Sequence, residues 1–331
     1  MFDNALLRRL VTVTSVYLGF VLVTALLPVF LLATILADLT RRLVAGKPFM
    51  ATRMLIFGWL YLVGEVWGLL ILGITALLPR ARAVQATYRL QDRWAAWNFR
   101  AVRFIFGLHF IADGQESITP GPVILLSRHA SLIDTLLPSW FVTRQVGITV
   151  RYVLKKELLL DPALDVAGNR LPNHFVDRGA VDNERDFDAI RRLGSGLSGD
   201  EAVLIYPEGT RFSEQKRVRY VKRFAQRTGR VAEIASGLRS VLPPRPGGTL
   251  ALLEGSTADV VVLAHRGLEG FARVQDMWKG GIVGSRIDVL FHRIARAEIP
   301  EGRTDRVQWL FETWREIDTW VTGEEPLPGL A

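Results

Sequence analysis

The chain has 331 residues, a net charge of +8 at pH 7 and 22% charged residues, yet its mean hydropathy is positive at +0.21. This combination of apolar and charged residues predicts two unlike regions within a chain long enough for one large domain and an appendage. The absence of cysteine excludes disulfides, thiolate metal sites and cysteine nucleophiles. The basic balance favours anionic partners: phospholipid headgroups, phosphorylated cofactors or nucleic acid.

Two apolar segments begin the chain. Residues 10–37 carry no charge, and residues 54–79 carry one, Glu65. At ~1.5 Å per residue, a helix over either segment exceeds the ~30 Å hydrocarbon core of a bilayer. We therefore predict a membrane anchor of two helices over residues 1–82. A cleaved signal peptide is the alternative for the first segment, but its length and the second segment argue against it.

The orientation of this anchor depends on its basic flanks. The connecting loop carries Arg41, Arg42, Lys47 and Arg53, and the outer flanks carry Arg8, Arg9, Arg80, Arg82, Arg89 and Arg93. This small excess on the outer flanks favours both chain ends in the cytoplasm, and we expect a bacterial inner membrane. Pro28 can kink a helix, so a re-entrant hairpin is a second interpretation. Glu65 is either a functional carboxylate or, as we favour, paired with a neighbouring helix.

Residues 83–105 mix tryptophan and phenylalanine with arginine. This pattern predicts an amphipathic helix at the membrane surface. The same periodicity fits a helix packed on the following domain equally well.

Residues 106–331 alternate short apolar runs with amphipathic stretches. Strands are expected at 123–127, 149–154, 174–177, 202–206, 259–264 and 287–291, and helices at 131–143, 184–194, 217–235 and 305–321. This alternation predicts an α/β domain with a largely parallel sheet flanked by helices. In such sheets the chemistry lies where strands end and turns begin.

The first candidate site is a His–x4–Asp pattern made by His129 and Asp134. On one continuous helix their side chains would differ by ~140°, so they meet only if His129 precedes the helix and folds back over its first turn. Ser131 is placed to cap that helix. An Asp bonded to one imidazole nitrogen leaves the other free as a general base. By itself the spacing also fits a surface histidine near a helix acid.

The second candidate site is Glu208-Gly209-Thr210-Arg211, at the end of another expected strand. Gly209 permits close approach of the backbone, and Arg211 offers a forked donor that matches phosphate. An ordinary turn with a solvated Glu–Arg pair is the alternative.

Together these segments resemble the glycerolipid acyltransferases of the 1-acylglycerol-3-phosphate acyltransferase family. Three further blocks match in order: Leu-Lys-Lys-Glu-Leu at 154–158, His-Phe-Val-Asp-Arg at 174–178, and Val-Val-Val-Leu-Ala at 260–264. The resemblance covers about residues 106–270. Residues 242–248 and 299–300 are similar to the longer branch, which includes lysophosphatidate and lysocardiolipin acyltransferases. Ser127 and Tyr206 depart from the more usual Asn and Phe without removing a chemical role.

The resemblance implies transfer of an acyl group from acyl-CoA or acyl-carrier protein, with no bound cofactor. The acceptor it favours is a lysophospholipid hydroxyl, that of 1-acylglycerol-3-phosphate, giving phosphatidic acid. It implies that His129 takes the proton of the attacking hydroxyl and that Asp134 orients His129. Lys155 is the candidate donor to the oxyanion that forms.

The resemblance also implies a site for the phosphate of the acceptor. Its expected residues are Arg178, Glu208, Gly209, Thr210 and Arg211. Structural ion pairing is the alternative for Arg178 and for Lys156.

Other functions fit less well. The basic stretch 211–239 lacks the aromatic interleaving of a nucleic-acid site, so we expect no nucleic-acid partner and instead contact with membrane lipid or coenzyme A phosphates. No His/carboxylate cluster has the spacing of metal ligands. Another lysophospholipid or glycerol-3-phosphate could be the acceptor. A non-catalytic lipid-binding membrane protein on this fold would not need a positioned base.

Overall fold

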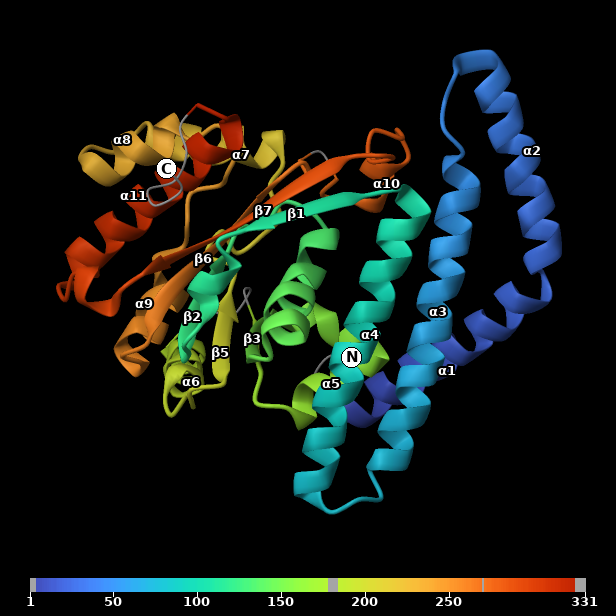
Figure 1. The fold of residues 1–331 in the computed structure, drawn as a ribbon, viewed down its shortest axis with the longest axis horizontal. Helices are drawn as coiled ribbons and strands as arrows, with labels where there is room; N and C mark the ends of the chain where they lie inside the picture. The colour runs from blue at the N-terminus through green and yellow to red at the C-terminus, as the bar shows by residue number, and fades with distance from the viewer. Residues whose placement is uncertain (1–3, 178–183, 270, 325–331) are drawn as a thin grey trace. The chain divides into compact units, whose positions relative to one another are not determined.

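The computed structural model describes residues 4–177, 184–269 and 271–324 (Figure 1). The chain forms two compact units. The first unit comprises Met1–His109, Leu154–Phe175 and Val274–Ser285, and the second comprises Phe110–Val153, Val176–Arg273 and Arg286–Ala331. Each unit is therefore assembled from separate stretches of sequence, whereas the expected division into 1–82, 83–105 and 106–331 was sequential.

The first unit is helical. Its long helices are α1 (Ala5–Ala25), α2 (Leu27–Ala45), α3 (Met50–Thr75) and α4 (Arg80–Phe106), and it also contains α5 (Pro162–Arg170) and α10 (Val274–Met277). The single helix expected over 10–37 is in fact two helices that meet at Leu26. Pro28 lies in the first turn of α2, where its missing N–H is tolerated and its fixed φ favours a new helix start.

Helices α1 and α3 are long and apolar enough to cross a membrane. Both pack within the first unit, and α3 runs beside α4 (Figure 1). Helix α4 buries Leu90, Phe99 and Val102 and leaves Phe104 exposed. The indole of Trp97 donates to the carbonyl of Leu60 at 3.1 Å, which ties α4 to α3.

Helix α1 is also tied to α5 by charge. Arg8 and Arg9 both donate to the buried carboxylate of Asp165, at 3.0 and 3.2 Å. The Arg8 guanidinium is itself buried. The Asp165 carboxylate thus binds both arginines, which the sequence analysis counted among the basic flanks of the anchor.

The chain forms one sheet of order β1-β7-β6-β2-β5-β3-β4, most of which belongs to the second unit. The strands are β1 (His109–Asp113), β2 (Val123–Ser127), β3 (Thr149–Lys155), β4 (His174–Val176), β5 (Glu201–Ile205), β6 (Asp259–Arg266) and β7 (Arg286–Ile294). Strand β2 pairs in parallel with β5 and β6, β3 pairs in parallel with β5, and β7 is antiparallel to β6. The predicted α/β fold with a largely parallel sheet is confirmed.

Helices cover one face of this sheet. Ile124 and Leu126 of β2 face a core formed with α6 (Glu184–Gly194), α8 (Arg230–Gly237), α9 (Pro246–Gly255) and α11 (Arg303–Thr322). Helices α8 and α11 lie side by side (Figure 1). Because side chains alternate along a strand, Leu125 and Ser127 face the other side of the sheet. There Phe141 packs against Phe110 and Phe291, with ring centroids 6.5 and 6.2 Å apart.

Two expected helices differ in the structure. The one over 131–143 is a 3₁₀ turn, Ile133–Leu136, followed by a π-helix, Pro138–Arg144. Pro138 cannot donate a backbone hydrogen bond to the preceding turn, so a regular α-helix is not continued there. The helix over 217–235 is α7 (Glu214–Phe224) and α8, with Gly229 between them at φ +99°.

Candidate functional site

His129 and Asp134 meet at the carboxyl end of β2. The strand ends at Ser127, His129 follows in the turn, and Asp134 lies in the 3₁₀ turn beyond it. The Nδ1 atom of His129 is 2.9 Å from Oδ1 of Asp134. The chain thus folds back over its next turn, as the spacing requires. Ser131 does not cap an α-helix; its hydroxyl accepts a hydrogen bond from the backbone N–H of Ile133 within this turn.

The Asp134 carboxylate is fully buried and its oxygens are engaged by donors. Oδ2 accepts the backbone N–H groups of Ala130 and Ser131 at 2.6 and 2.7 Å. Burial raises the pKa of Asp134, but the charge and hydrogen bond of His129, with the contact of His265, outweigh burial and hold that pKa well below its ordinary value. Asp134 is therefore anionic, and Nδ1 of His129 carries a proton. This leaves Nε2 as the basic nitrogen.

The Tyr206 ring restricts the His129 imidazole. The two ring centroids are 4.4 Å apart. Burial raises the pKa of Tyr206 well above its ordinary value, so its hydroxyl keeps its proton. Tyr206 directly follows β5, so a neighbouring parallel strand supplies one wall of the site.

Glu208 joins the second motif to the first. Its buried carboxylate accepts the backbone N–H of His129 at 2.8 Å and that of Leu242 at 3.0 Å. Burial raises the pKa of Glu208 to about 7, although the charge of Arg128 and the two N–H groups act against it. Both carboxylate oxygens thus accept backbone N–H groups, so Glu208 positions the backbone at His129 and at Leu242.

Gly209 and Thr210 shape the turn after Glu208. Gly209 has a φ of +68°, a conformation that side chains disfavour, and a Cβ there would lie 3.0 Å from Cδ of Arg245. The Thr210 hydroxyl accepts a hydrogen bond from Nζ of Lys216 at 2.8 Å. The backbone therefore favours glycine at position 209, and a Cβ there would also have to displace the Arg245 side chain.

Arg211 has an unused donor. Its Nη1 atom is buried and has no hydrogen-bond partner among the described residues. The next residue, Phe212, donates its N–H to the carbonyl of His129 at 2.8 Å, so Arg211 is attached to the His129 turn through backbone. A buried guanidinium nitrogen without a partner is well suited to an anionic ligand.

Among the described residues, no contact brings Lys155 into this arrangement. Lys155 ends β3, and its ammonium lies 2.8 Å from the Glu157 carboxylate, with both side chains about half exposed. Exposed pairs of this kind contribute little stability, so the pair leaves Lys155 available. Its role toward an oxyanion stays a prediction. Arg178 lies outside the described residues.

Two buried residues of the site were not anticipated. Arg128 donates to the carbonyls of His265 and Ser240, the latter at 2.7 Å, and to the carboxylate of Glu269. His265 is also buried, with Nε2 3.4 Å from Oδ2 of Asp134. The signal for His265 was its place directly after the strand expected at 259–264, since chemistry in such sheets lies where strands end.

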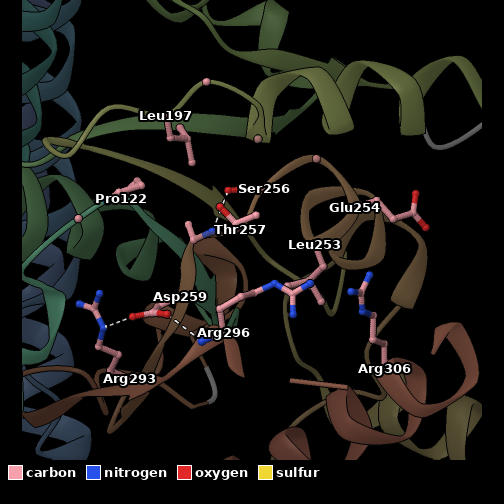
Figure 2. A pocket seen from close by; sticks show the side chains of 15 residues that line it. Pro122, Leu197, Leu253, Glu254, Ser256, Thr257, Asp259, Arg293, Arg296 and Arg306 are labelled. Atoms are coloured by element: carbon pink, nitrogen blue, oxygen red, sulfur yellow. Dashed lines mark hydrogen bonds and ion pairs between the residues drawn. The ribbon is translucent and has the colours of Figure 1, made fainter. Parts of the chain in front are cut away.

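A cavity of about 700 Å³ lies at the opposite end of these strands, where β2 and β6 begin (Figure 2). Its lining includes Pro122, which precedes β2, and Asp259, which begins β6. Figure 2 shows Asp259 bonded to the Arg293 guanidinium and to the backbone N–H of Arg296, at 2.8 and 2.7 Å. Because His129 follows the carboxyl end of β2, this cavity is separate from the His129 site.

Comparisons with known proteins find acyltransferases for part of the chain. Residues 109–251 match the family model described as Acyltransferase. The chain is 31% identical over 153 residues to 1-acyl-sn-glycerol-3-phosphate acyltransferase of Pseudomonas aeruginosa, covering 44% of this chain and 53% of that protein. The match thus spans about half the length of that relative.

Two animal relatives align over more of the chain. Identity is 25% over 270 residues to 1-acyl-sn-glycerol-3-phosphate acyltransferase epsilon of Mus musculus, covering 74% of this chain and 69% of that protein. It is 24% over 278 residues to lysophosphatidylinositol acyltransferase 10 of Caenorhabditis elegans, covering 78% and 68%.

The fold also matches the crystal structure of the 1-acyl-sn-glycerophosphate (LPA) acyltransferase PlsC from Thermotoga maritima. The TM-score is 0.53 at 15% identity, covering 83% of this chain and 97% of that one. The match of residues 109–251 to the Acyltransferase family model confirms the resemblance over this part of the chain.

Proposed function

We propose that this protein transfers a fatty acyl group from a thioester to the hydroxyl of a lysophospholipid. The observation that carries the proposal is the 2.9 Å contact between His129 Nδ1 and the fully buried Asp134 carboxylate. An anionic partner fixes the imidazole tautomer and leaves Nε2 ready to accept a proton. A domain that only bound lipid would have no use for that arrangement.

The reaction needs one base and no covalent acyl-enzyme. Nε2 of His129 takes the proton of the acceptor hydroxyl as its oxygen bonds to the thioester carbonyl carbon. The tetrahedral intermediate then collapses and the C–S bond breaks. The departing sulfur takes the proton from the imidazolium and leaves as the free thiol. Asp134 stabilises the imidazolium throughout. Donors aimed at the oxyanion contribute a few kcal/mol in comparable sites, and Lys155 is the proposed donor.

The acceptor we favour is 1-acylglycerol-3-phosphate, with phosphatidic acid as product. The unpartnered buried Nη1 of Arg211 supports an acceptor that carries a phosphate. Relatives named for 1-acyl-sn-glycerol-3-phosphate agree with this choice, and the one named for lysophosphatidylinositol marks a second acceptor to be tested. We assign Arg178 to the same phosphate from its place in the family motif.

We propose that the first unit anchors the enzyme in a membrane, with the second unit in the cytoplasm. Apolar side chains along α1, including Leu6, Leu10 and Leu18, are mostly exposed, and both α1 and α3 are long enough to cross a bilayer. Exposed apolar surface of this extent favours a lipid environment. The donor would then be a cytoplasmic thioester, acyl-CoA or acyl-carrier protein.

The proposal is tested with detergent-solubilised full-length protein. Labelled acyl-CoA and acyl-carrier protein are offered with lysophosphatidate, lysophosphatidylinositol and glycerol-3-phosphate, and both lipid product and free thiol are measured. His129→Ala should lower kcat about 10²- to 10⁴-fold. His109→Ala, on an exposed position of β1, is the matched control. Wild-type protein that acylates no acceptor would refute the enzyme, and an active His129→Ala protein would refute the base.

A further inference from the structure

His265 is a second histidine at the Asp134 carboxylate. Its imidazole is fully buried near the end of β6, with Nε2 3.4 Å from Oδ2 of Asp134 and 3.3 Å from the carbonyl oxygen of Arg128. We propose that His265 is a positioning residue that fixes Asp134, and the backbone just before His129, for proton transfer. The inference rests on the proposed function, in which the His129–Asp134 pair is the base.

The register of the sheet brings His265 to this place. Ser127 of β2 pairs with Leu263 of β6, so β6 continues past the end of β2, where the chain turns toward His129. Val260, Val262 and Ala264 face the core under the helices. Strand alternation therefore points His265 to the opposite face, the one that carries Ser127.

Reciprocal bonds lock His265 in position. The Arg128 guanidinium donates to the backbone carbonyl of His265, while Nε2 of His265 lies within hydrogen-bond distance of the backbone carbonyl of Arg128. Arg128 is also held by Glu269 and by the carbonyl of Ser240. Arg128, which directly precedes His129, is thus held by hydrogen bonds of both its side chain and its backbone. His265 is a partner in both.

The chemistry of the imidazole argues for a role beyond filling space. Nδ1 of His265 is buried without a hydrogen-bond partner among the described residues, a cost that an apolar side chain would avoid. Nε2, in contrast, faces two acceptors. A proton on Nε2 supplies a donor to the side of Asp134 opposite His129, which limits rotation of the carboxylate away from His129 Nδ1.

The kinetic test compares one substitution of His265 that keeps a hydrogen-bond donor with one that removes it. His265→Gln keeps an amide N–H at a position close to Nε2, whereas His265→Leu removes it at similar volume. We expect His265→Leu to lower kcat about tenfold to a hundredfold, with KM nearly unchanged, and His265→Gln to stay within about threefold of wild type. His292→Leu, on β7 of the same sheet, is the control and should leave kcat unchanged.

A double-mutant cycle separates positioning from general destabilisation. If His265 acts through Asp134, adding His265→Leu to Asp134→Asn should cost less than about twofold. Equal costs in both backgrounds would show a role independent of Asp134 and overturn the proposal. Melting temperatures verify folding. Should His265→Leu not fold, His265→Asn replaces it, because its shorter amide does not reach Asp134 and the same loss is expected.

A spectroscopic measurement distinguishes this inference from the proposed function. Nitrogen-15 NMR of labelled histidine, assigned with His129→Asn, reports which nitrogen of neutral His129 carries the proton. Wild type and His265→Gln should show one tautomer, and His265→Leu should show averaged shifts like those of Asp134→Asn. A single tautomer in folded His265→Leu overturns the positioning role even in an inactive protein. Wild-type protein that is inactive yet shows these shifts refutes only the proposed function.

Discussion

The turns after β2 and β5 each bury a carboxylate, and the pKa values of the two carboxylates are shifted in opposite directions. Asp134 has a depressed pKa because His129 and His265 outweigh its burial. Glu208 has a pKa raised to about 7, because burial outweighs Arg128 and two backbone N–H groups. Burial alone therefore does not set the charge; the partners do. The first carboxylate is suited to support an imidazolium, and the second to hold two loops together.

The largest effect should come from removing the charge of Asp134. Asp134→Asn keeps the shape but offers Nδ1 of His129 no anion, so the wrong tautomer becomes accessible. We expect kcat to fall about 10³- to 10⁴-fold, with little change in KM. Glu208→Gln, which preserves the size of a carboxylate that touches only backbone, should lower kcat less than about tenfold. Equal losses in the two variants would contradict the division of roles.

Removing the Glu208 side chain should instead reduce stability. Glu208→Ala leaves the N–H groups of His129 and Leu242 without their acceptor. Each buried unpaired group costs about 1–3 kcal/mol, so the free energy of unfolding should fall by about 2–6 kcal/mol. Denaturant unfolding of the solubilised protein measures this, and Glu254→Ala, at a surface ion pair, is the control. A loss below about 0.5 kcal/mol, the usual scale of surface substitutions, would argue against this bracing role.

The smallest effect is a pH dependence of opposite sign at the two carboxylates. The raised pKa of Glu208 contributes stability that is fully present below its ordinary value of 4.5 and is lost as pH rises through about 7. Asp134 contributes stability that is present above its ordinary value of 3.8 and is lost as pH falls. Between pH 5 and 7 the free energy of unfolding of the wild type should therefore fall with pH through Glu208, by at most about 1.4 kcal/mol per pH unit. Glu208→Gln should remove this contribution. Melting temperatures across that range test it, and an unchanged slope in Glu208→Gln would contradict the raised pKa.

The fold was largely predictable because the strands are buried and apolar. Strand β2 matches its expected range, and β5 and β6 begin within a residue of theirs. Strand β1 was missed because its residues are half exposed and do not alternate clearly between apolar and polar. Helix α9 was missed because the Pro-Gly-Gly at its start indicates a turn in the sequence, although proline is accepted in a first helical turn.

The site was predictable only where its parts are close in sequence. His129 and Asp134 are five residues apart, and local geometry alone requires the fold-back. The contact of Arg128 with His265 joins residues 137 apart, and it depends on the register of β2 against β6. The hydrophobic pattern of each strand does not specify which residues of β2 and β6 pair with one another. The resemblance placed Glu208 at the acceptor site, which stays a prediction, and it gave no sign that the carboxylate also accepts the backbone N–H groups of His129 and Leu242.

The attachment of α1 to α5 has a consequence for the order of events during synthesis. Arg9 and its partner Asp165 are 156 residues apart. At ribosomal rates of about 5–20 residues per second, Asp165 is made about 8–30 s after Arg9. Throughout that interval both arginines at the start of α1 lack the carboxylate that later pairs with them. The nascent helix therefore reaches its surroundings as a cation, and becomes part of a closed polar contact only after the ribosome has passed the middle of the chain.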